Sequence, residues 1–224
     1  MTFVLVTEKI WHINFFEILK EESEHSWFLI NSKKEFNIGH LREINPDKIF
    51  IPHWSYIIKE EIFSNYECIV FHMTDLPYGR GGSPLQNLIV RGHSETKVSA
   101  LKVTKGIDEG DIYLKRDLNL NGTAEEIFMR CSKVIFEMID EIIFKAIKPI
   151  PQIGDIVNFK RRTPDQSDLS NLKTLEDIFN YIRMLDAEQY PKAFLETETL
   201  KFEFSRASYK SDKSIIADVR ITKK

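Results

Sequence analysis

Strand-like and helix-like stretches alternate through the first third of the sequence, and this alternation restricts the possible folds more than any other feature. The helical stretches separate four short apolar runs. These runs have the length of buried strands and occupy residues 3–7, 26–31, 48–52 and 67–72. A β-α-β-α-β order predicts a parallel sheet whose crossover connections are right-handed.

Helical periodicity is clearest in two places. In the stretch 11–22 and the residue before it, one face of the predicted helix collects Ile10, Ile13, Phe16 and Leu19. Thr123 and Glu126 have the spacing of a capping box, which satisfies free amides at the start of a helix. From there an amphipathic helix is predicted to about Lys148, because prolines follow at 149 and 151.

The remaining elements complete the expected architecture. Two strands at 96–105 and 111–120 are joined by a short glycine-bounded loop, and alternating residues near the end of the chain predict a hairpin over 199–223. We therefore expect an α/β fold, Rossmann-like, with a mostly parallel sheet flanked by helices over 1–150. A small C-terminal lobe of helix and hairpin is expected over 151–224.

Composition excludes several classes of function. The net charge is -3 and the pI is near 6.1, which leaves no electrostatic footprint for nucleic acid. Cys68 and Cys131 fall in apolar segments and are expected to be inert thiols in a reducing compartment. No apolar run approaches the roughly 18 residues of a membrane span. We expect a cytoplasmic protein without nucleic-acid or membrane partners.

The segment after the fourth strand has the composition of a binding site. His72 ends a buried strand, and Arg80 follows among Gly79, Gly81 and Gly82. Ligands bind outside the carboxyl ends of parallel strands, glycines allow close approach of the backbone, and arginine can clamp an anion. A surface loop with an incidental arginine is the alternative.

A second loop carries Asp108 between two glycines. Acidic residues in such loops are usually turn formers. A carboxylate beside a histidine can instead fix its tautomer and stabilise the imidazolium. The spacing between Asp108 and His72 does not show that they meet. The other histidines (His12, His25, His40 and His93) are too scattered to predict a metal site.

Together these segments resemble the folate-dependent formyltransferase family. Its pattern runs Asn-x-His-x-Ser-Leu-Leu-Pro-x-x-Arg-Gly-x-x-Pro, continues to Thr-Gly-Val-Thr, and ends at Asp-x-Gly-x-Ile. The matching positions in this chain are His72, Thr74, Leu76, Pro77, Arg80, Gly81, Pro84, Thr96, Val98, Ser99, Asp108, Gly110 and Ile112. Lys97 departs from the pattern where the family has glycine.

The resemblance implies direct transfer of a formyl group from 10-formyltetrahydrofolate to an amine within a formyltransferase catalytic domain. His72 would stabilise an oxyanion or relay a proton, Asp108 would orient His72 or accept the amine proton, and Thr74 takes the position of the family's serine. Residues 51–63 resemble the strand and turn that line the folate pocket. The implied folate contacts are His53, Trp54, Tyr56, Ile57, Val103 and Gly106.

One departure affects catalysis. Val70 stands where the family has an asparagine that helps to stabilise the tetrahedral intermediate. Valine cannot donate a hydrogen bond. Thr74, Gln86 or Asn87 would have to supply a replacement, or the enzyme is slow, or the chain is a non-catalytic folate- or sugar-binding relative.

The acceptor is predicted from the C-terminal part. Residues 159–170 and 182–194 resemble the nucleotide-sugar N-formyltransferase branch. The expected acceptor is therefore the amine of a nucleotide-linked amino sugar for surface glycan biosynthesis, with nonulosonic acids such as pseudaminic acid as one subset. Another amine is the alternative. The expected substrate contacts are Asp75, Arg80, Gly81, Gly82, Gln86 and Arg161. The terminal hairpin could also form a homodimer interface.

Overall fold

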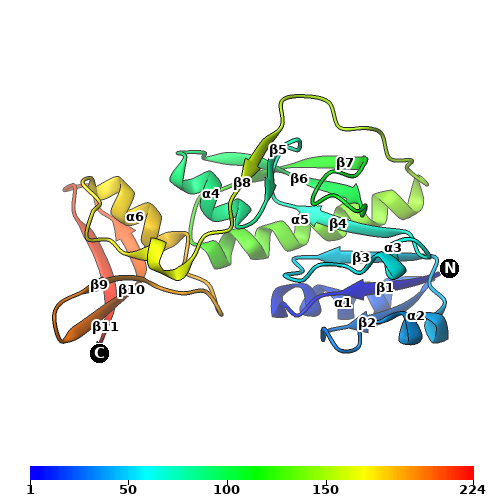
Figure 1. Cartoon of the computed structure of the whole chain (residues 1–224), viewed down its shortest axis with the longest axis horizontal. Coiled ribbons are helices and arrows are strands. Elements are labelled where there is room, and N and C mark those ends of the chain that lie inside the picture. The colour runs from blue at the N-terminus through cyan, green and yellow to red at the C-terminus, as the bar shows by residue number, and fades with distance from the viewer. The chain divides into compact units, whose positions relative to one another are not determined.

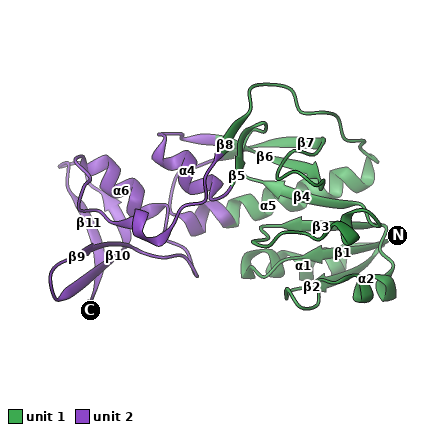
Figure 2. Ribbon diagram, in the orientation of Figure 1, with its two compact units in different colours: residues 1–81, 96–118, 129–158 green, residues 82–95, 119–128, 159–224 purple.

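The computed structural model describes all residues from Met1 to Lys224 and divides into two compact units (Figure 2). Unit 1 comprises residues 1–81, 96–118 and 129–158, and unit 2 comprises 82–95, 119–128 and 159–224. Each unit is therefore assembled from several segments of the chain. The two compact units are not the linear segments 1–150 and 151–224.

Unit 1 is built on a six-stranded sheet in the order β2-β1-β3-β4-β6-β7 (Figure 1). Neighbouring strands from β2 to β4 are parallel, and β6 is antiparallel to β4. The strands are β1 (Thr2–Val6), β2 (Ser26–Ile30), β3 (Lys48–Pro52), β4 (Cys68–His72), β6 (Glu95–Lys102) and β7 (Ile112–Asn119). The predicted α/β fold, with its largely parallel sheet, is confirmed.

The helices of unit 1 follow the predicted crossovers. They are α1 (Ile10–Glu22), α2 (Ile38–Ile44), α3 (Glu60–Phe63) and the part of α5 (Ala124–Phe144) from residue 129 onward. The Thr123–Glu126 capping box is present. The helix ends at Phe144, earlier than the predicted end near Lys148. None of the helices combines the length and the apolar composition that a membrane crossing requires.

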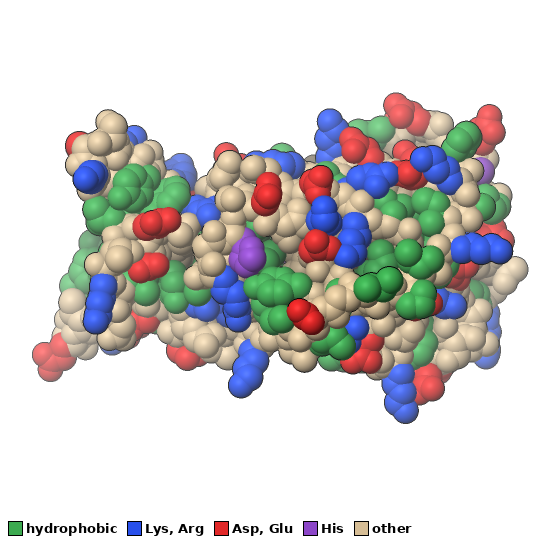
Figure 3. Space-filling model, turned by 90° about the horizontal axis from the view of Figure 1, so that it is seen from above, with side chains coloured by type: hydrophobic (Ala, Val, Ile, Leu, Met, Phe, Trp, Pro, Cys, Tyr) green, Lys and Arg blue, Asp and Glu red, His purple; other side chains and the backbone are tan.

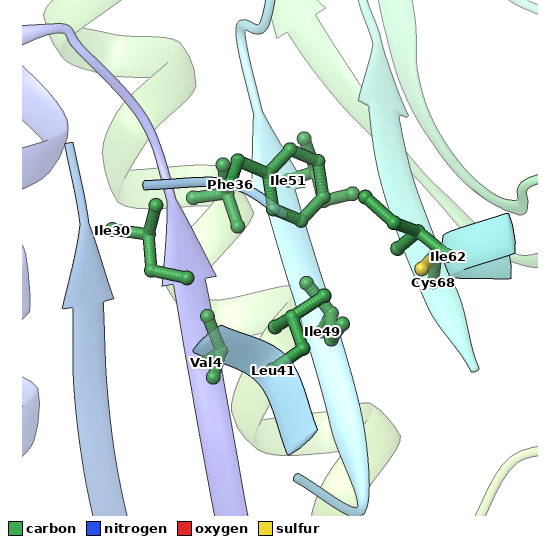
Figure 4. Packing of buried hydrophobic residues seen from close by; sticks show 9 residues of the cluster. Val4, Ile30, Phe36, Leu41, Ile49, Ile51, Ile62 and Cys68 are labelled. Atoms are coloured by element: carbon green, nitrogen blue, oxygen red, sulfur yellow. The ribbon is translucent and has the colours of Figure 1, made fainter. Parts of the chain in front are cut away.

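The core explains why the central strands read as unbroken apolar runs. Residues 3–6 of β1 are fully buried, because both faces of the sheet are covered. On one face, Val4 and Ile49 pack with Leu41 of α2 and Ile62 of α3 (Figure 4).

The predicted inner face of α1 is partly wrong. Ile10 is 52% exposed, and the buried residues are Trp11, His12 and Phe16. His12 is polar, yet it is buried because its ring nitrogen Nδ1 bonds the hydroxyl of Ser132 on α5. Sequence periodicity counts only apolar positions, so it could not assign a histidine to the inner face.

Unit 2 combines helices α4 (Pro84–Val90) and α6 (Leu175–Arg183) with a three-stranded antiparallel sheet. The sheet order is β11-β10-β9. Strands β10 (Leu200–Tyr209) and β11 (Ile215–Lys223) form the predicted terminal hairpin, and β9 is Ala193–Glu196. Arg183 ties α6 to the chain before α5, since its Nη1 donates to the carbonyls of Leu120 and Gly122.

Candidate active site

His72 is the last residue of β4 and is buried. The strand lies between β3 and β6, and His72 pairs with Ser99 of β6. Since β4 is parallel to its neighbour β3, the imidazole sits at the carboxyl edge of the parallel strands. Ligands in α/β sheets bind at that edge.

The two ring nitrogens of His72 have different partners. Nε2 lies 2.8 Å from the carbonyl oxygen of Gly79, which can only accept, so Nε2 carries a hydrogen and donates it. Nδ1 faces Asp108, 3.5 Å from Oδ2. The structure thus brings together two residues that sequence spacing could not connect.

Asp108 is held in place by the backbone of the glycine-rich segment. The amide of Gly81 donates to Asp108 Oδ2 at 2.9 Å. Asp108 also has a φ of 55°, a conformation that non-glycine residues rarely adopt and that is frequent at functional sites. Short strand β5 (Tyr78–Gly81) contains Gly81 and pairs with β8 (Val157–Phe159).

Gln152 supports this loop, and sequence reasoning missed it. Its Nε2 donates to the carbonyls of Asp108 and Gly110, at 2.8 Å each. Its Oε1 accepts from Nε and Nη2 of Arg80. Arg80 Nη1 also lies 3.6 Å from Glu109. The guanidinium that we expected at the substrate is therefore engaged within the loop, and no motif marked Gln152.

The residues between His72 and Gly79 are fixed by neighbouring strands. Ser99 is fully buried and donates to the Thr74 carbonyl at 2.7 Å. The Thr74 hydroxyl is itself buried, 3.5 Å from the Gly79 carbonyl. Asp75, predicted at the substrate, forms an ion pair with Lys115 at 2.5 Å.

The position of the expected asparagine is apolar. Val70 packs against Leu76, Leu101 and Ile112. The two amides considered as replacements are engaged within unit 2. Gln86 Nε2 donates to the Met184 carbonyl at 3.0 Å, and Asn87 Nδ2 donates to the carbonyls of Gly82, Ser83 and Lys160. Neither side chain is free to take the missing role while these bonds persist.

Gly82 and Arg161, both predicted at the substrate, are neighbours in unit 2. The Gly82 amide donates to the Phe159 carbonyl at 3.2 Å. A Cβ atom on Gly82 would lie 2.6 Å from Cβ of Arg161, closer than real atoms approach. Glycine is required here by packing.

The residues expected to bind folate after β3 form an aromatic surface. Trp54 packs edge-on against Phe36 and against Tyr56, with ring centroids 5.6 and 5.1 Å apart. Ile57 is 79% exposed. The Glu8 carboxylate raises the pKa of Tyr56. Aromatic faces beside an exposed aliphatic side chain fit a flat heterocycle such as a pterin.

His53, also predicted at the folate, has a φ of 53° and packs against Trp11 and His12, with ring centroids 5.6 and 6.2 Å away. Val103 packs on the same core cluster as Trp54, and its amide donates to the Cys68 carbonyl. At Gly106 an added Cβ would lie 2.0 Å from Glu109 Oε2.

Two other kinds of reactive centre, a metal site and a reactive thiol, are not found in the structure. No group of three or more His, Cys, Asp or Glu residues could hold a metal ion. Cys68 and Cys131 are free and buried, and burial raises the pKa of each thiol to about 12. Both therefore stay protonated at neutral pH and are poor nucleophiles.

Comparison with known proteins gives two family matches. A model described as formyl transferase matches residues 16–135, and one described as methionyl-tRNA formyltransferase, C-terminal domain, matches 164–222. The curated methionyl-tRNA formyltransferase of Ehrlichia ruminantium strain Gardel is 30% identical over 182 residues, which cover 78% of this chain and 58% of that protein. The chain thus spans little more than half the length of this relative.

Two solved structures complete the comparison. The structure titled methionyl-tRNA formyltransferase from Clostridium thermocellum is 52% identical, covers all of both chains, and superposes with a TM-score of 0.97. A sugar N-formyltransferase from Shewanella is 15% identical, with a TM-score of 0.68 over 97% of this chain and 96% of that one. At this identity the second likeness shows the fold alone.

Proposed function

The chain belongs to the formyl transferase family, and on that premise we propose that it transfers a formyl group from 10-formyltetrahydrofolate to a primary amine. The observation that carries the proposal is the pairing of His72 with Asp108 at the carboxyl edge of the sheet, 3.5 Å apart. Both residues lie within the segment matched by the family model.

10-formyltetrahydrofolate supplies the formyl group: the amine nitrogen bonds to the formyl carbon, the bond from that carbon to the folate nitrogen breaks, and a proton moves from the amine to the folate nitrogen. Residues of this chain handle the charge and the proton. The Nε2–H of His72, now donated to the Gly79 carbonyl, turns to the developing oxyanion, which is the stronger acceptor.

Asp108 accepts the proton that leaves the amine, and Nδ1 of His72 shares it across 3.5 Å. The Gly81 amide and the Gln152 side chain keep the carboxylate and its loop in position for this step. Much of the rate comes from holding donor and acceptor in line. With Val70 in place of an amide, His72 carries the oxyanion with less help than in relatives.

The names of the relatives support the α-amine of methionyl-tRNA as the acceptor. The curated relative at 30% identity and the solved structure at 52% identity both carry that name. The sugar enzyme is similar at 15% identity, too distant to support a sugar acceptor. The prediction of a nucleotide-linked amino sugar therefore has no support from the similar proteins.

The charge distribution favours a second candidate class of acceptor, the nucleotide-linked amino sugars. Unit 2 contains equal numbers of basic and acidic residues, and the whole chain has a net charge of -3. On the face shown in Figure 3, side chains of both signs are interspersed. Binding of a transfer RNA draws much of its affinity from a basic surface. A compact acceptor such as a nucleotide-linked amino sugar does not require one.

The test is a mass-spectrometric assay with 10-formyltetrahydrofolate and, in separate reactions, methionyl-tRNA or a panel of nucleotide-linked amino sugars. We expect one acceptor to gain a single formyl group, and the gain to be lost in His72→Ala. His40→Ala is the matched control, because His40 contacts only the Glu35 carbonyl through its ring. Folate binding without transfer to any acceptor would instead indicate a non-catalytic relative.

A further inference from the structure

The sheet of unit 1 has its topological switch point between β1 and β3. From β1 the chain crosses to β2 on one side, and it then continues to β3 on the other side of β1. Crevices open at such points, outside the carboxyl ends of the strands. A histidine follows each of the two strands: His12 lies in the first turn of α1, shortly after β1, and His53 directly follows β3.

The hydrogen bonds of Ser132 fix the tautomer of His12. The Ser132 hydroxyl has one hydrogen, which it donates to the Trp11 carbonyl at 3.1 Å. It must therefore accept from Nδ1 of His12, which lies 2.8 Å away. The hydrogen of the neutral His12 ring is then on Nδ1, and Nε2 presents a bare lone pair.

That lone pair has no partner in the protein. His12 is 1% exposed, and its Nε2 makes no hydrogen bond. Buried polar atoms of native proteins are nearly always paired, so an orphaned acceptor at the switch point indicates a ligand that brings the donor. The centroids of the Trp11 and His53 rings lie 6.3 and 6.2 Å from that of the His12 ring.

The surroundings keep His12 in its accepting form. Burial, followed by His53 and Lys9, lowers the pKa of His12 well below 6.5. Burial and Lys9 lower the pKa of His53 to about 3. At neutral pH both rings are uncharged, and Nε2 of His12 stays an acceptor rather than becoming a competing donor.

We propose that Nε2 of His12 accepts a hydrogen bond from an N–H or O–H group of the formyl acceptor and so positions that substrate at the switch point. The inference rests on the proposed transfer to an amine. His72 ends β4, two strands from β1, and strands are about 4.8 Å apart, so the two histidines follow strands about 10 Å apart. The acceptor is thus an extended molecule with a polar donor about that far from its reactive amine.

Two substitutions of His12 distinguish the hydrogen bond that Nε2 accepts from the contribution of the ring to packing. His12→Asn keeps a donor for Ser132 near the place of Nδ1 but removes the acceptor at Nε2. His12→Gln places an amide oxygen near Nε2. We expect His12→Asn to raise KM for the formylated acceptor about tenfold, the effect of one lost hydrogen bond, with KM for 10-formyltetrahydrofolate unchanged. His12→Gln should restore most of the affinity.

A measurement on the wild-type protein does not depend on turnover or on a stable variant. With ¹⁵N-labelled histidine, the Nε2 resonance of His12 is followed while methionyl-tRNA or a nucleotide-linked amino sugar is added in the presence of tetrahydrofolate, which cannot donate formyl. A shift on adding the acceptor supports the inference. An unmoved resonance beside active transfer would overturn the inference alone. An unmoved resonance without transfer to either acceptor would overturn both it and the proposed function.

Discussion

The guanidinium of Arg80 donates two hydrogen bonds to the side-chain oxygen of Gln152, a residue 72 positions further along the chain. The amide of Gln152 then holds the carbonyls of Asp108 and Gly110. A single neutral side chain therefore connects an arginine of the glycine-rich segment to the backbone of the loop that carries the carboxylate. Gln152 acts as a positioning residue for Asp108.

Replacing Gln152 is expected to slow the reaction without unfolding the protein. In Gln152→Leu both sets of bonds are lost, and we expect kcat for formyl transfer to fall about tenfold, because small displacements of catalytic groups cost that much or more. Gln152→Glu keeps an oxygen that accepts from Arg80 but loses the bonds to the carbonyls of Asp108 and Gly110. Its kcat therefore measures the effect of losing the support of the Asp108 loop. An unchanged kcat in both folded variants, measured by steady-state kinetics, would refute the role.

Removing the charge of Asp108 is expected to affect the chemical step. Asp108→Asn keeps the size of the side chain and an oxygen for the Gly81 amide. It cannot accept the amine proton, so kcat should fall about 10²-fold or more. Single-turnover measurements separate this loss from product release. Asp117→Asn is the control, since Asp117 pairs with Lys97 on the exposed side of β7.

The buried His12 and the half-buried His53 predict a pH dependence of stability. Both His12 and His53 have a lowered pKa in the folded state, so the unfolded chain binds their protons more tightly. Stability is complete above pH 6.5 and falls as the pH drops, by about 1.4 kcal/mol per pH unit for each histidine. Urea unfolding between pH 6.5 and 5 measures the slope. His12→Gln should flatten it by about half, and an equal slope would contradict the assignment.

Arg183 is expected to stabilise unit 2. Its guanidinium is held by the carbonyls of Leu120 and Gly122 and by the side chain of Asn180, and burial lowers its pKa. Arg183→Met keeps the apolar stem but leaves these acceptors without a donor, which should cost about 2 kcal/mol of unfolding free energy. Urea denaturation measures the loss. Arg220→Met, on an exposed position of β11, should change stability by less than about 0.5 kcal/mol.

The terminal hairpin is the surface through which we expect a homodimer to form. Strand β11 is an edge strand, and Val219 and Ile221 are 47% and 54% exposed on the same face of it. Exposed apolar edge strands favour pairing with another chain. We expect a dimer by size-exclusion chromatography with light scattering, and a monomer for Val219→Lys. Arg220→Glu, on the opposite face, should leave the mass unchanged. A wild-type monomer at all concentrations would exclude the dimer.

The sequence predicted the regular part of the fold well, for a physical reason. Strands buried on both faces are continuous apolar runs, and crossovers between them have few allowed topologies. The short strands β5, β8 and β9 were missed. They contain four residues or fewer, and β5 and β8 pair with each other across a long stretch of chain, so neither periodicity nor length marks them.

The candidate site was predicted unevenly. His72 and Asp108 were found because they belong to a motif, and the structure brings them together. Gln152 belongs to no motif, and a lone glutamine after a proline carries no signal. Arg80 has the right chemistry for an anion, yet its bonds to Gln152 use that chemistry internally. The acceptor was the weakest prediction, because a substrate is chosen by contacts in space that a linear pattern does not record.

The division into two units has a consequence for how such a protein can change. The chain passes between units at five places, after residues 81, 95, 118, 128 and 158. No single cut releases either unit as a continuous fragment, so a recombination event cannot exchange one of them as a cassette. A new specificity housed in unit 2 has to arise by substitutions scattered over three separate stretches of sequence. This connectivity therefore leaves accumulation of point substitutions, rather than recombination of whole domains, as the way in which specificity can change.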